Sequence, residues 1–343
     1  IDLFEKEINK DNLNLTAGRS VACVDRKGDG MYGFYVANYG GPTRFYEMSN
    51  KKIIDKASEL GLDKITGGRS VVSGHILSNN IDIFAANERG SNFLYKNVDG
   101  IFFDMAASQR VLDTYQNGRG TVLSDILYRG NLDIINGNWD GYHRLFVKRE
   151  NFFEDIATSP FNTPSKIRTV ISADFDNDGF DEVFMNNIGE PNKLFKILDN
   201  GKVKEISIKT ALEPNGLGTG AAVADIDNDG ILELLISHGE VGLQKLTLYK
   251  ANIVKKKNFI RIKPLNKNGA PARGATVTLI SNKRKHAKTI DSGSGYLCQM
   301  EPVAHYGIRD KEEDFLVKIR WTNGEESTYK INEVGKTYTY TQK

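Results

Sequence analysis

The feature that most constrains the fold is an internal repeat of about 50 residues. The opening of the repeat recurs five times, at Gly18-Arg19-Ser20, Gly68-Arg69-Ser70, Gly118-Arg119-Gly120, Ile167-Arg168-Thr169 and Gly218-Thr219-Gly220. Each opening starts a short apolar run, and these runs end at Asp25, His75, Asp125, Asp174 and Asp225. A second apolar run in each repeat ends at Asn38, Asn87, Asn138, Asn187 and His238. Self-similarity at a fixed period indicates that each copy is one supersecondary unit.

The repeat predicts an all-β fold, because its apolar runs are short, rich in Val, Ile, Phe and Tyr, and separated by Gly, Asn and Asp. Four runs per repeat match the four-stranded blade of a β-propeller. We place the repeats near residues 17–66, 67–116, 117–166, 167–216 and 217–250. The last repeat lacks a fourth run, and Phe4-Glu5 matches that motif. We therefore predict a five-bladed propeller over residues 1–250, closed by its N-terminal strand; a solenoid of independent hairpins is the alternative.

Repeats four and five carry acidic loops between their first and second strands. These loops span residues 174–182 and 225–233, with acids at positions 1, 3, 5 and 9 and glycine at position 6. Such a loop can wrap several oxygen ligands around one hard cation, and Ca²⁺ accepts six to eight oxygens in irregular geometry. We predict two Ca²⁺ sites, with the ligands Asp174, Asp176, Asp178, Glu182, Asp225, Asp227, Asp229 and Glu233. Asp/Asn turn chemistry without a metal is the alternative.

The corresponding loops of repeats one to three have lost this pattern. Lys27 stands at position 3 of the first loop, Leu77 at position 3 of the second, and Arg129 at position 5 of the third. We expect these three loops to fold without calcium. An EF-hand is the other interpretation of an acidic DxDxDG loop, but it requires flanking helices, and strand patterns flank these loops.

Residues 251–343 show the alternation of half-buried strands, and we predict a small β-sandwich-like domain there. Its motifs are Gly269 to Leu279, Gly293-Ser294-Gly295-Tyr296-Leu297-Cys298-Gln299, His305-Tyr306-Gly307-Ile308 and Trp321-Thr322-Asn323-Gly324. With the acidic loops, these motifs resemble FG-GAP/VCBS-repeat propellers that carry a C-terminal ASPIC/UnbV domain, the cartilage acidic protein-like family. The resemblance implies calcium-stabilised blades, secreted, periplasmic or cell-surface placement, and a binding or adhesion role. It supplies no catalytic residue.

Charge is unevenly distributed along the chain. Residues 251–343 contain 18 Lys and Arg against 9 Asp and Glu, whereas residues 1–250 contain 28 against 35. A solvated basic surface or a patch for an anionic polymer explains the C-terminal excess. No reader motif for nucleic acid accompanies it, so we expect no nucleic-acid partner. No apolar run is long enough to span a bilayer, and Ile1 to Glu5 lack the pattern of a signal peptide. We expect a monomer with two buried free thiols, Cys23 and Cys298.

Propeller geometry predicts where a ligand would bind. First strands line a central channel, so their starts should gather at the channel end opposite the acidic loops. Candidate ligand-binding residues at that end are Arg19, Arg69, Arg119, Arg168, Asn38, Asn87, Asn138, Asn187, Trp139 and His238. Guanidiniums gathered near one axis repel one another unless carboxylates, carbonyls or an anion lie between them. Capping of neighbouring carbonyls is the structural alternative.

Two function hypotheses follow from this arrangement. The first is a calcium-binding, non-catalytic module for binding or adhesion that recognises a glycan, an anionic small molecule or a protein at this channel end. The second is a hydrolase or lyase whose acid and base groups come from Glu88, Asp140, His143, His238 or Glu240. No Ser/His/Asp or Cys/His arrangement is readable in the sequence, so we favour the binding module. Paired acids or a His–acid contact at the channel end would favour the enzyme.

Overall fold

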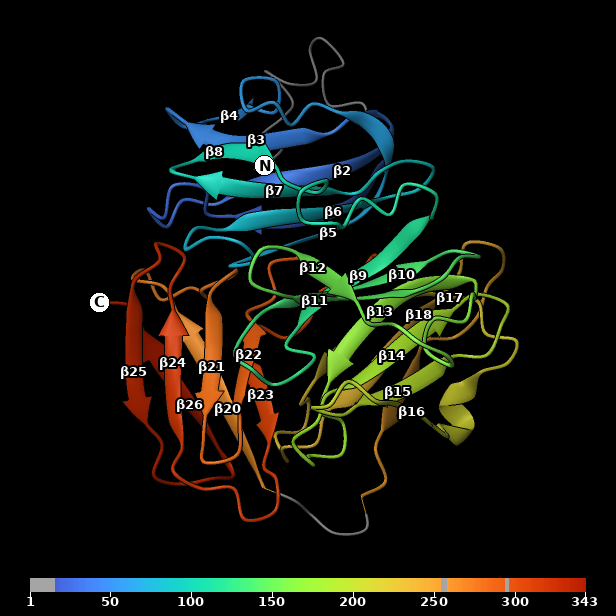
Figure 1. Cartoon of the computed structure of the whole chain (residues 1–343), viewed down its shortest axis with the longest axis vertical. Helices are drawn as coiled ribbons and strands as arrows, with labels where there is room; N and C mark the ends of the chain where they lie inside the picture. Colours follow the sequence, from blue (N-terminus) through green and yellow to red (C-terminus); the bar gives the residue numbers. More distant parts are fainter. Residues whose placement is uncertain (1–15, 254–257, 294–295) are drawn as a thin grey trace.

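The computed structural model describes residues 16–253, 258–293 and 296–343. Their strands form five blades in sequence order, followed by a C-terminal β unit (Figure 1). The predicted five-bladed propeller with a small β domain after it is confirmed. The proposed closing strand at Phe4-Glu5 lies outside the described residues. No described helix has the length and apolar character needed to cross a membrane.

The blades are antiparallel sheets, and each begins with the strand nearest the channel. Blade one holds β1 (Gly18–Val24), β2 (Gly33–Pro42), β3 (Arg44–Ser49) and β4 (Lys52–Asp55). Blade two holds β5 (Ile65–Gly74), β6 (Asp82–Asn87), β7 (Phe93–Val98) and β8 (Ile101–Asp104). Blade three holds β9 (Gly118–Ser124), β10 (Asp133–Asn138), β11 (Arg144–Lys148) and β12 (Phe153–Asp155). Blade four holds β13 (Ile167–Ala173), β14 (Glu182–Asn187), β15 (Lys193–Ile197) and β16 (Val203–Ile206). Blade five holds β17 (Gly218–Ala224), β18 (Glu233–His238) and β19 (Thr247–Lys250), after the 3₁₀ turn η1 (Lys209–Leu212).

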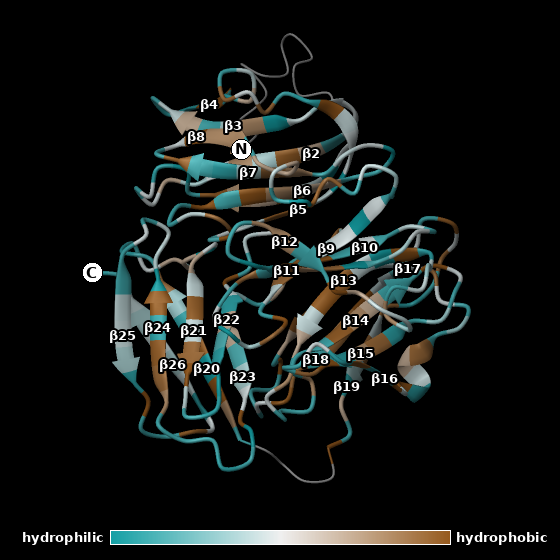
Figure 2. Cartoon of the chain, in the orientation of Figure 1, coloured by the Kyte–Doolittle hydropathy of each residue, from teal (hydrophilic) through white to brown (hydrophobic). Residues whose placement is uncertain are grey.

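Apolar clusters between neighbouring blades hold the propeller together, and Figure 2 shows many of the hydrophobic residues along the strands of the blades. Successive residues of a strand point to opposite faces, so Val71 packs between blades one and two while Val72 packs between blades two and three. Both faces of a central blade are therefore buried. On the outer faces of blades one and five, by contrast, Phe34 is 45% exposed and Leu248 is 55% exposed.

The C-terminal unit consists of two sheets that curl around one core. Its strands are β20 (Phe259–Leu265), β21 (Thr276–Ile280), β22 (Lys285–Thr289), β23 (Ala304–Gly307), β24 (Leu316–Arg320), β25 (Glu326–Lys330) and β26 (Lys336–Thr341). One sheet has the order β23-β20-β26 and the other the order β22-β21-β24-β25. Trp321 and Tyr306 are buried in the core between them. We refer to residues 258–343, without 294–295, as the C-terminal unit.

A long loop of the C-terminal unit enters the propeller channel. Ser292 accepts a hydrogen bond from Cys23 N of β1 and its Oγ lies 2.7 Å from Ser73 Oγ of β5. Further along the same loop, Tyr296 O accepts from Thr169 Oγ1 of β13, and Met300 Sδ accepts from Val223 N of β17. The channel is therefore occupied from the side of the acidic loops.

Candidate functional site

The acidic loop of blade four, which we call loop four (residues 174–182), connects β13 to β14 without a helix on either side. Asp174, Asp176 and Glu182 each place a carboxylate oxygen within 4.8 Å of the others. Gly179 at position 6 has φ +82°, which an L residue rarely adopts, and its N–H donates to Asp174 Oδ2. The strands on both sides exclude the EF-hand interpretation.

Loop five (residues 225–233) repeats this geometry between β17 and β18. Asp225, Asp227 and Asp229 bring carboxylate oxygens within 4.8 Å of one another, and Gly230 N donates to Asp225 Oδ2 over 3.1 Å. Among the described residues, the groups of three or more side chains that could hold a metal ion are these two, one in loop four and one in loop five.

A lysine lies against each acidic cluster, a feature that the sequence analysis missed. Lys196 of β15 pairs across the sheet with Glu182, and its Nζ lies 2.8 Å from Glu182 Oε1 and 3.3 Å from Asp176 Oδ2. Lys250 of β19 faces Glu233 in the same way, with Nζ 2.6 Å from Glu233 Oε1. The same lysines also contact the remaining predicted ligands: Lys196 pairs with Asp178, and Lys250 pairs with Glu233.

Lys196 does not fully compensate the negative charge of the buried carboxylates in loop four. Burial raises the pKa of Asp174 to about 7, and the neighbouring Asp181 adds to this shift. Burial, together with Asp174, raises the pKa of Glu182 well above its ordinary value. Among the described residues, Asp225 Oδ1 is a buried oxygen without a hydrogen-bond donor, while Glu182 Oε1 and Glu233 Oε1 have a lysine Nζ as their neighbouring donor. A divalent cation with oxygen ligands satisfies such atoms, so the donor set fits calcium.

Backbone donors hold the carboxylates of loops one to three, as they hold the position 1 aspartates of loops four and five, but among the described residues no cluster of three acids accompanies them. In loop one (residues 25–33) the N–H groups of Asp29 and Gly30 donate to Asp25. In loop three (residues 125–133) Arg129 N and Gly130 N donate to Asp125 in the same pattern. Loop two (residues 75–82) is shorter, and Asp82 Oδ2 accepts from three consecutive backbone N–H groups. Hydrogen-bond donors thus satisfy these carboxylates without a metal.

The opposite end of the channel, which we call the mouth, gathers the predicted arginines. Each first strand has a β-bulge at its start, and the bulged residues are Arg19, Arg69, Arg119, Arg168 and Thr219. A bulge leaves one residue without a cross-strand partner and redirects its side chain. Arg69, Arg119 and Arg168 are only 7%, 6% and 6% exposed.

Aromatic rings and carboxylates separate these guanidiniums. The guanidiniums of Arg19 and Arg69 lie 5.8 and 4.1 Å from the ring centroid of Tyr39. Those of Arg119 and Arg168 lie 4.9 and 4.3 Å from the ring centroid of Trp139. The rings therefore contact cations already, and cation–π attraction accounts for their place here.

Two glutamates complete the mouth. Glu88 accepts from Arg69 Nε at 2.6 Å and lies 3.0 Å from Arg119 Nη2, while Glu240 lies 2.6 Å from Arg168 Nη2. Burial and the positive charge of Arg69 lower the pKa of Arg119 to about 10, although Glu88 opposes this. Among the described residues, Arg119 Nε and both Nε and Nη1 of Arg168 are buried donors without an acceptor. The mouth therefore has a surplus of positive charge and of hydrogen-bond donors.

The predicted asparagines have a structural role. In blades one to four the side-chain amide donates to the backbone carbonyl four residues further on: Asn38 to Pro42, Asn87 to Ser91, Asn138 to Tyr142 and Asn187 to Pro191. His238 contacts Lys245 O through Nδ1 in blade five. These five contacts close the loop after the second strand at the mouth.

One His–acid contact occurs near the mouth. His238 Nε2 lies 2.8 Å from Glu213 Oε2, and Tyr249 and Thr247 donate to Glu213 Oε1. Because Lys245 O occupies the other imidazole nitrogen, this histidine has no free nitrogen with which to act on a substrate. The contact therefore does not favour the hydrolase or lyase.

Comparisons with known proteins agree with the motifs in both parts of the chain. Residues 265–343 match the family model described as ASPIC and UnbV, and residues 174–236 match the FG-GAP-like repeat. The chain is 45% identical to cartilage acidic protein 1 of Xenopus tropicalis, over 97% of this chain and 56% of that protein. The resemblance to FG-GAP proteins with a C-terminal ASPIC/UnbV domain is confirmed.

Other relatives give the same result. The human cartilage acidic protein 1 is 44% identical over 94% of this chain and 53% of its own length. The chain thus spans about half the length of the curated relatives it matches. A lectin of Burkholderia pseudomallei has a TM-score of 0.45 at 11% identity, covering 93% of this chain and all of that one. At this TM-score the likeness carries no inference about a ligand.

His143 shows how blade three departs from its neighbours. Its Nδ1 accepts from Asn138 N, as Asn92 accepts from Asn87 N and Asn192 from Asn187 N in blades two and four. The tautomer assigned from these contacts has Nε2 donating to Ser165 Oγ, 3.1 Å away. Burial lowers the pKa of His143 from 6.5 to about 3, and the positive charges of Lys193 and Arg144 add to this shift.

We expect His143→Asn to reduce the loss of stability in acid. A folded pKa below the unfolded one means that His143 contributes its full stability above pH 6.5 and loses it as the pH falls toward 3. The wild type should lose about 2 kcal/mol more than the variant between pH 8 and pH 5. Urea denaturation of both proteins at the two pH values measures the difference, and an equal loss in both would contradict the assignment.

Proposed function

We propose that the chain is a calcium-binding, secreted or cell-surface recognition module whose mouth binds an anionic ligand. The observation that carries the proposal is the surplus of buried guanidinium donors at the mouth, where Arg119 and Arg168 keep unpartnered N–H groups among the described residues. A carboxylate or sulfate group is the planar or tetrahedral acceptor that arginine recognises best. The ligand could carry this group on a glycan, a small molecule or a protein.

In this proposal, Glu240 competes with the ligand for the guanidinium of Arg168. Its side chain is 46% exposed and holds Arg168 Nη2 by one ion pair at the rim of the mouth. An incoming anion would displace this carboxylate and take its place on Arg168. The occupied channel behind the mouth limits the ligand to its anionic end and the atoms next to it.

Titration calorimetry with sulfated, carboxylated and uncharged oligosaccharides tests the mouth. We expect the charged probes to bind, Arg168→Met to weaken binding by tenfold or more, and Glu240→Gln to strengthen it by about threefold. Arg149→Met is the matched control, because Arg149 pairs with Glu154 on the surface away from the mouth. Free sulfate and an acidic peptide distinguish the source of the anionic group. Equal binding of charged and uncharged probes, or an unaffected Arg168→Met, would refute the proposal.

Calcium binding is the second part of the proposal. Loops four and five would each hold one Ca²⁺ by their position 1, 3, 5 and 9 carboxylates, and the ion would replace Lys196 and Lys250 as counter-charge. Asp176→Ala and Asp227→Ala should each remove one equivalent of calcium in calorimetry. Chelation by EGTA should lower the melting temperature of the wild type, and calcium should restore it. If neither substitution changes the stoichiometry, the two loops are not the calcium sites.

A further inference from the structure

The C-terminal unit contacts position 1 of all five loops. Each contact uses a different donor or hydroxyl: Thr322 Oγ1 on Asp25, Thr276 Oγ1 on His75, Ala287 N on Asp125, Gly307 N on Asp174, and Arg261 Nη1 on Asp225. The distances lie between 2.6 and 3.0 Å. The five-fold arrangement of the blades is therefore matched by five contact points on a unit that has no five-fold repeat.

The four aspartates make this contact through the same atom. Oδ2 of Asp25, Asp125, Asp174 and Asp225 accepts the contact from the C-terminal unit, and it also accepts the N–H of the loop's own position 6 glycine. The carboxylate thus ties the closed shape of its loop to the neighbouring unit. This role explains why loops one and three have an acid at position 1 although their other positions do not suit a metal.

In loops four and five the same carboxylates belong to the acidic clusters. Asp225 Oδ2 lies 2.8 Å from Arg261 Nη1, and Arg261 Nη2 continues to Glu301 Oε2 at 2.5 Å. Asp225 Oδ1 is buried and has no donor among the described residues. One oxygen of this carboxylate therefore serves docking, and the other is available to a cation.

We propose that calcium binding in loops four and five is positively coupled to docking of the C-terminal unit, through the shared carboxylates of Asp174 and Asp225. The inference rests on the proposed calcium binding. An ion on Oδ1 fixes the plane of the carboxylate and the closed loop, which places Oδ2 where Gly307 N and Arg261 reach it. Coupling is reciprocal, so docking raises the affinity for calcium by the same factor.

Hydrogen exchange of the full chain, read by mass spectrometry with and without calcium, tests the coupling. Chelation should speed exchange at least threefold in peptides that cover β20 and β23, where Arg261 and Gly307 lie. In the presence of calcium, Asp227→Asn should speed exchange in β20 in the same way. Asp227 belongs to the acidic cluster of loop five but makes no contact with the C-terminal unit among the described contacts. Asp125→Asn is the matched control: it should speed exchange near Ala287 and leave two equivalents of calcium bound.

A charge-matched variant tests whether docking of the C-terminal unit raises the affinity for calcium. Arg261→Lys keeps the positive charge but loses the forked geometry that joins Asp225 to Glu301. We expect it to lower the calcium affinity of loop five about threefold, whereas simple repulsion between cations predicts no change. Two equivalents of bound calcium with unchanged exchange in β20 and β23 would overturn the coupling and leave calcium binding intact. Absence of calcium binding in calorimetry would instead overturn the proposed calcium sites and the coupling with them.

Discussion

Replacing Gly307 by alanine should loosen the C-terminal unit from blade four and lower the free energy of unfolding by about 3 kcal/mol. A Cβ at this position would lie 2.2 Å from Asp174 Oδ2 and 2.4 Å from the backbone of Asn177. Neither neighbour can yield, because Asp174 is tied by its own loop and Asn177 lies within that loop. The new methyl group must separate β23 from loop four, which also costs the bond from Gly307 N to Asp174.

Urea denaturation followed by tryptophan fluorescence measures this effect in both parts of the chain. Trp139 lies at the mouth and Trp321 in the C-terminal core, so variants that keep only one of the two tryptophans report on each part separately. Gly90→Ala is the control, because a Cβ there meets no atom within 4 Å, and it should change stability by less than about 1 kcal/mol. If Gly307→Ala were as stable as Gly90→Ala, the close approach of the two parts would be wrong.

The second large effect is expected at Arg284, a buried cation that joins the two parts. Its Nε lies 2.9 Å from Glu312 Oε1, and the two side chains are 1% and 0% exposed. The same guanidinium donates to Gly307 O and to Gly179 O of loop four. Arg284→Met would leave the Glu312 carboxylate buried without its cation, and we expect a loss of about 3–5 kcal/mol in unfolding free energy.

A double-mutant cycle separates the lost pair from lost packing. Adding Glu312→Gln to Arg284→Met removes the uncompensated charge, and most of the loss should be recovered. Arg320→Met is the matched surface variant, since Arg320 and Glu326 are 31% and 39% exposed, and it should cost at most about 1 kcal/mol. Equal costs for Arg284→Met and Arg320→Met would show that the interface is open to water.

The repeat could be recognised in the sequence because the residues that define it lie close together within each copy. The bulged arginines, the acid at position 1 and the asparagine at the end of the second strand recur at fixed spacing, and each occupies the same place in its blade. The asparagine clamp to the carbonyl four residues further on is also local. The sequence analysis predicted these asparagines as ligand-binding residues without the clamp, because spacing alone does not show where a side-chain amide points.

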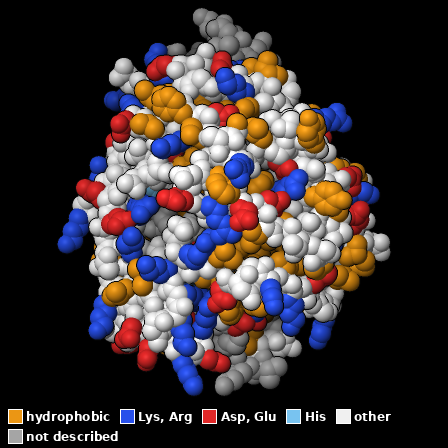
Figure 3. Space-filling view, in the orientation of Figure 1, with side chains coloured by type: hydrophobic (Ala, Val, Ile, Leu, Met, Phe, Trp, Pro, Cys, Tyr) orange, Lys and Arg blue, Asp and Glu red, His pale blue; other side chains and the backbone are white. Residues whose placement is uncertain are grey.

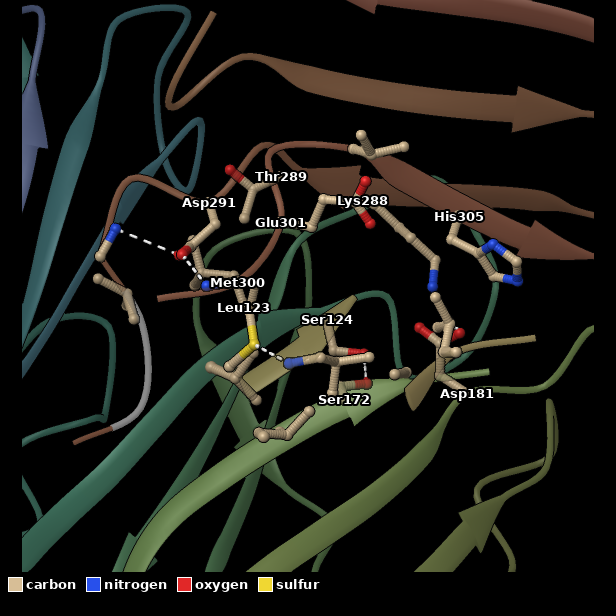
Figure 4. A pocket seen from close by; sticks show the side chains of 18 residues that line it. Leu123, Ser124, Ser172, Asp181, Lys288, Thr289, Asp291, Met300, Glu301 and His305 are labelled. Atoms are coloured by element: carbon tan, nitrogen blue, oxygen red, sulfur yellow. Dashed lines mark hydrogen bonds and ion pairs between the residues drawn. The ribbon is translucent and has the colours of Figure 1, made fainter. Parts of the chain in front are cut away.

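Docking of the C-terminal unit could not be predicted from the sequence, because its contacts join residues from 36 (Arg261 and Asp225) to 297 (Thr322 and Asp25) positions apart. The basic excess of residues 251–343 was interpreted as a solvated surface or a polymer patch. Part of it instead meets the acidic loops, where Lys288 contacts Asp181 beside His305 at the channel cavity (Figure 4). On the outer face shown in Figure 3, acidic and basic side chains are interspersed over both parts.

In the sequence, only glycines hinted at the loop of the C-terminal unit that enters the propeller channel. Gly293, with φ +142°, has no room for a Cβ, which would lie 2.3 Å from Val21 O. Both Gly293 and Gly307 stand in the C-terminal motifs, but the sequence does not name the residues that approach them. Between this loop, the first strands and the C-terminal sheets lies a cavity of about 100 Å³ (Figure 4), too small for a sugar.

A crystal structure of the full chain grown with calcium tests the central claim most directly, with the ions identified by their anomalous signal. The account predicts one ion in loop four and one in loop five, none in loops one to three, and Gly307 N and Arg261 still bound to Asp174 and Asp225. Ions in the first three loops but not the last two, or a C-terminal unit that no longer touches the position 1 carboxylates, would contradict it.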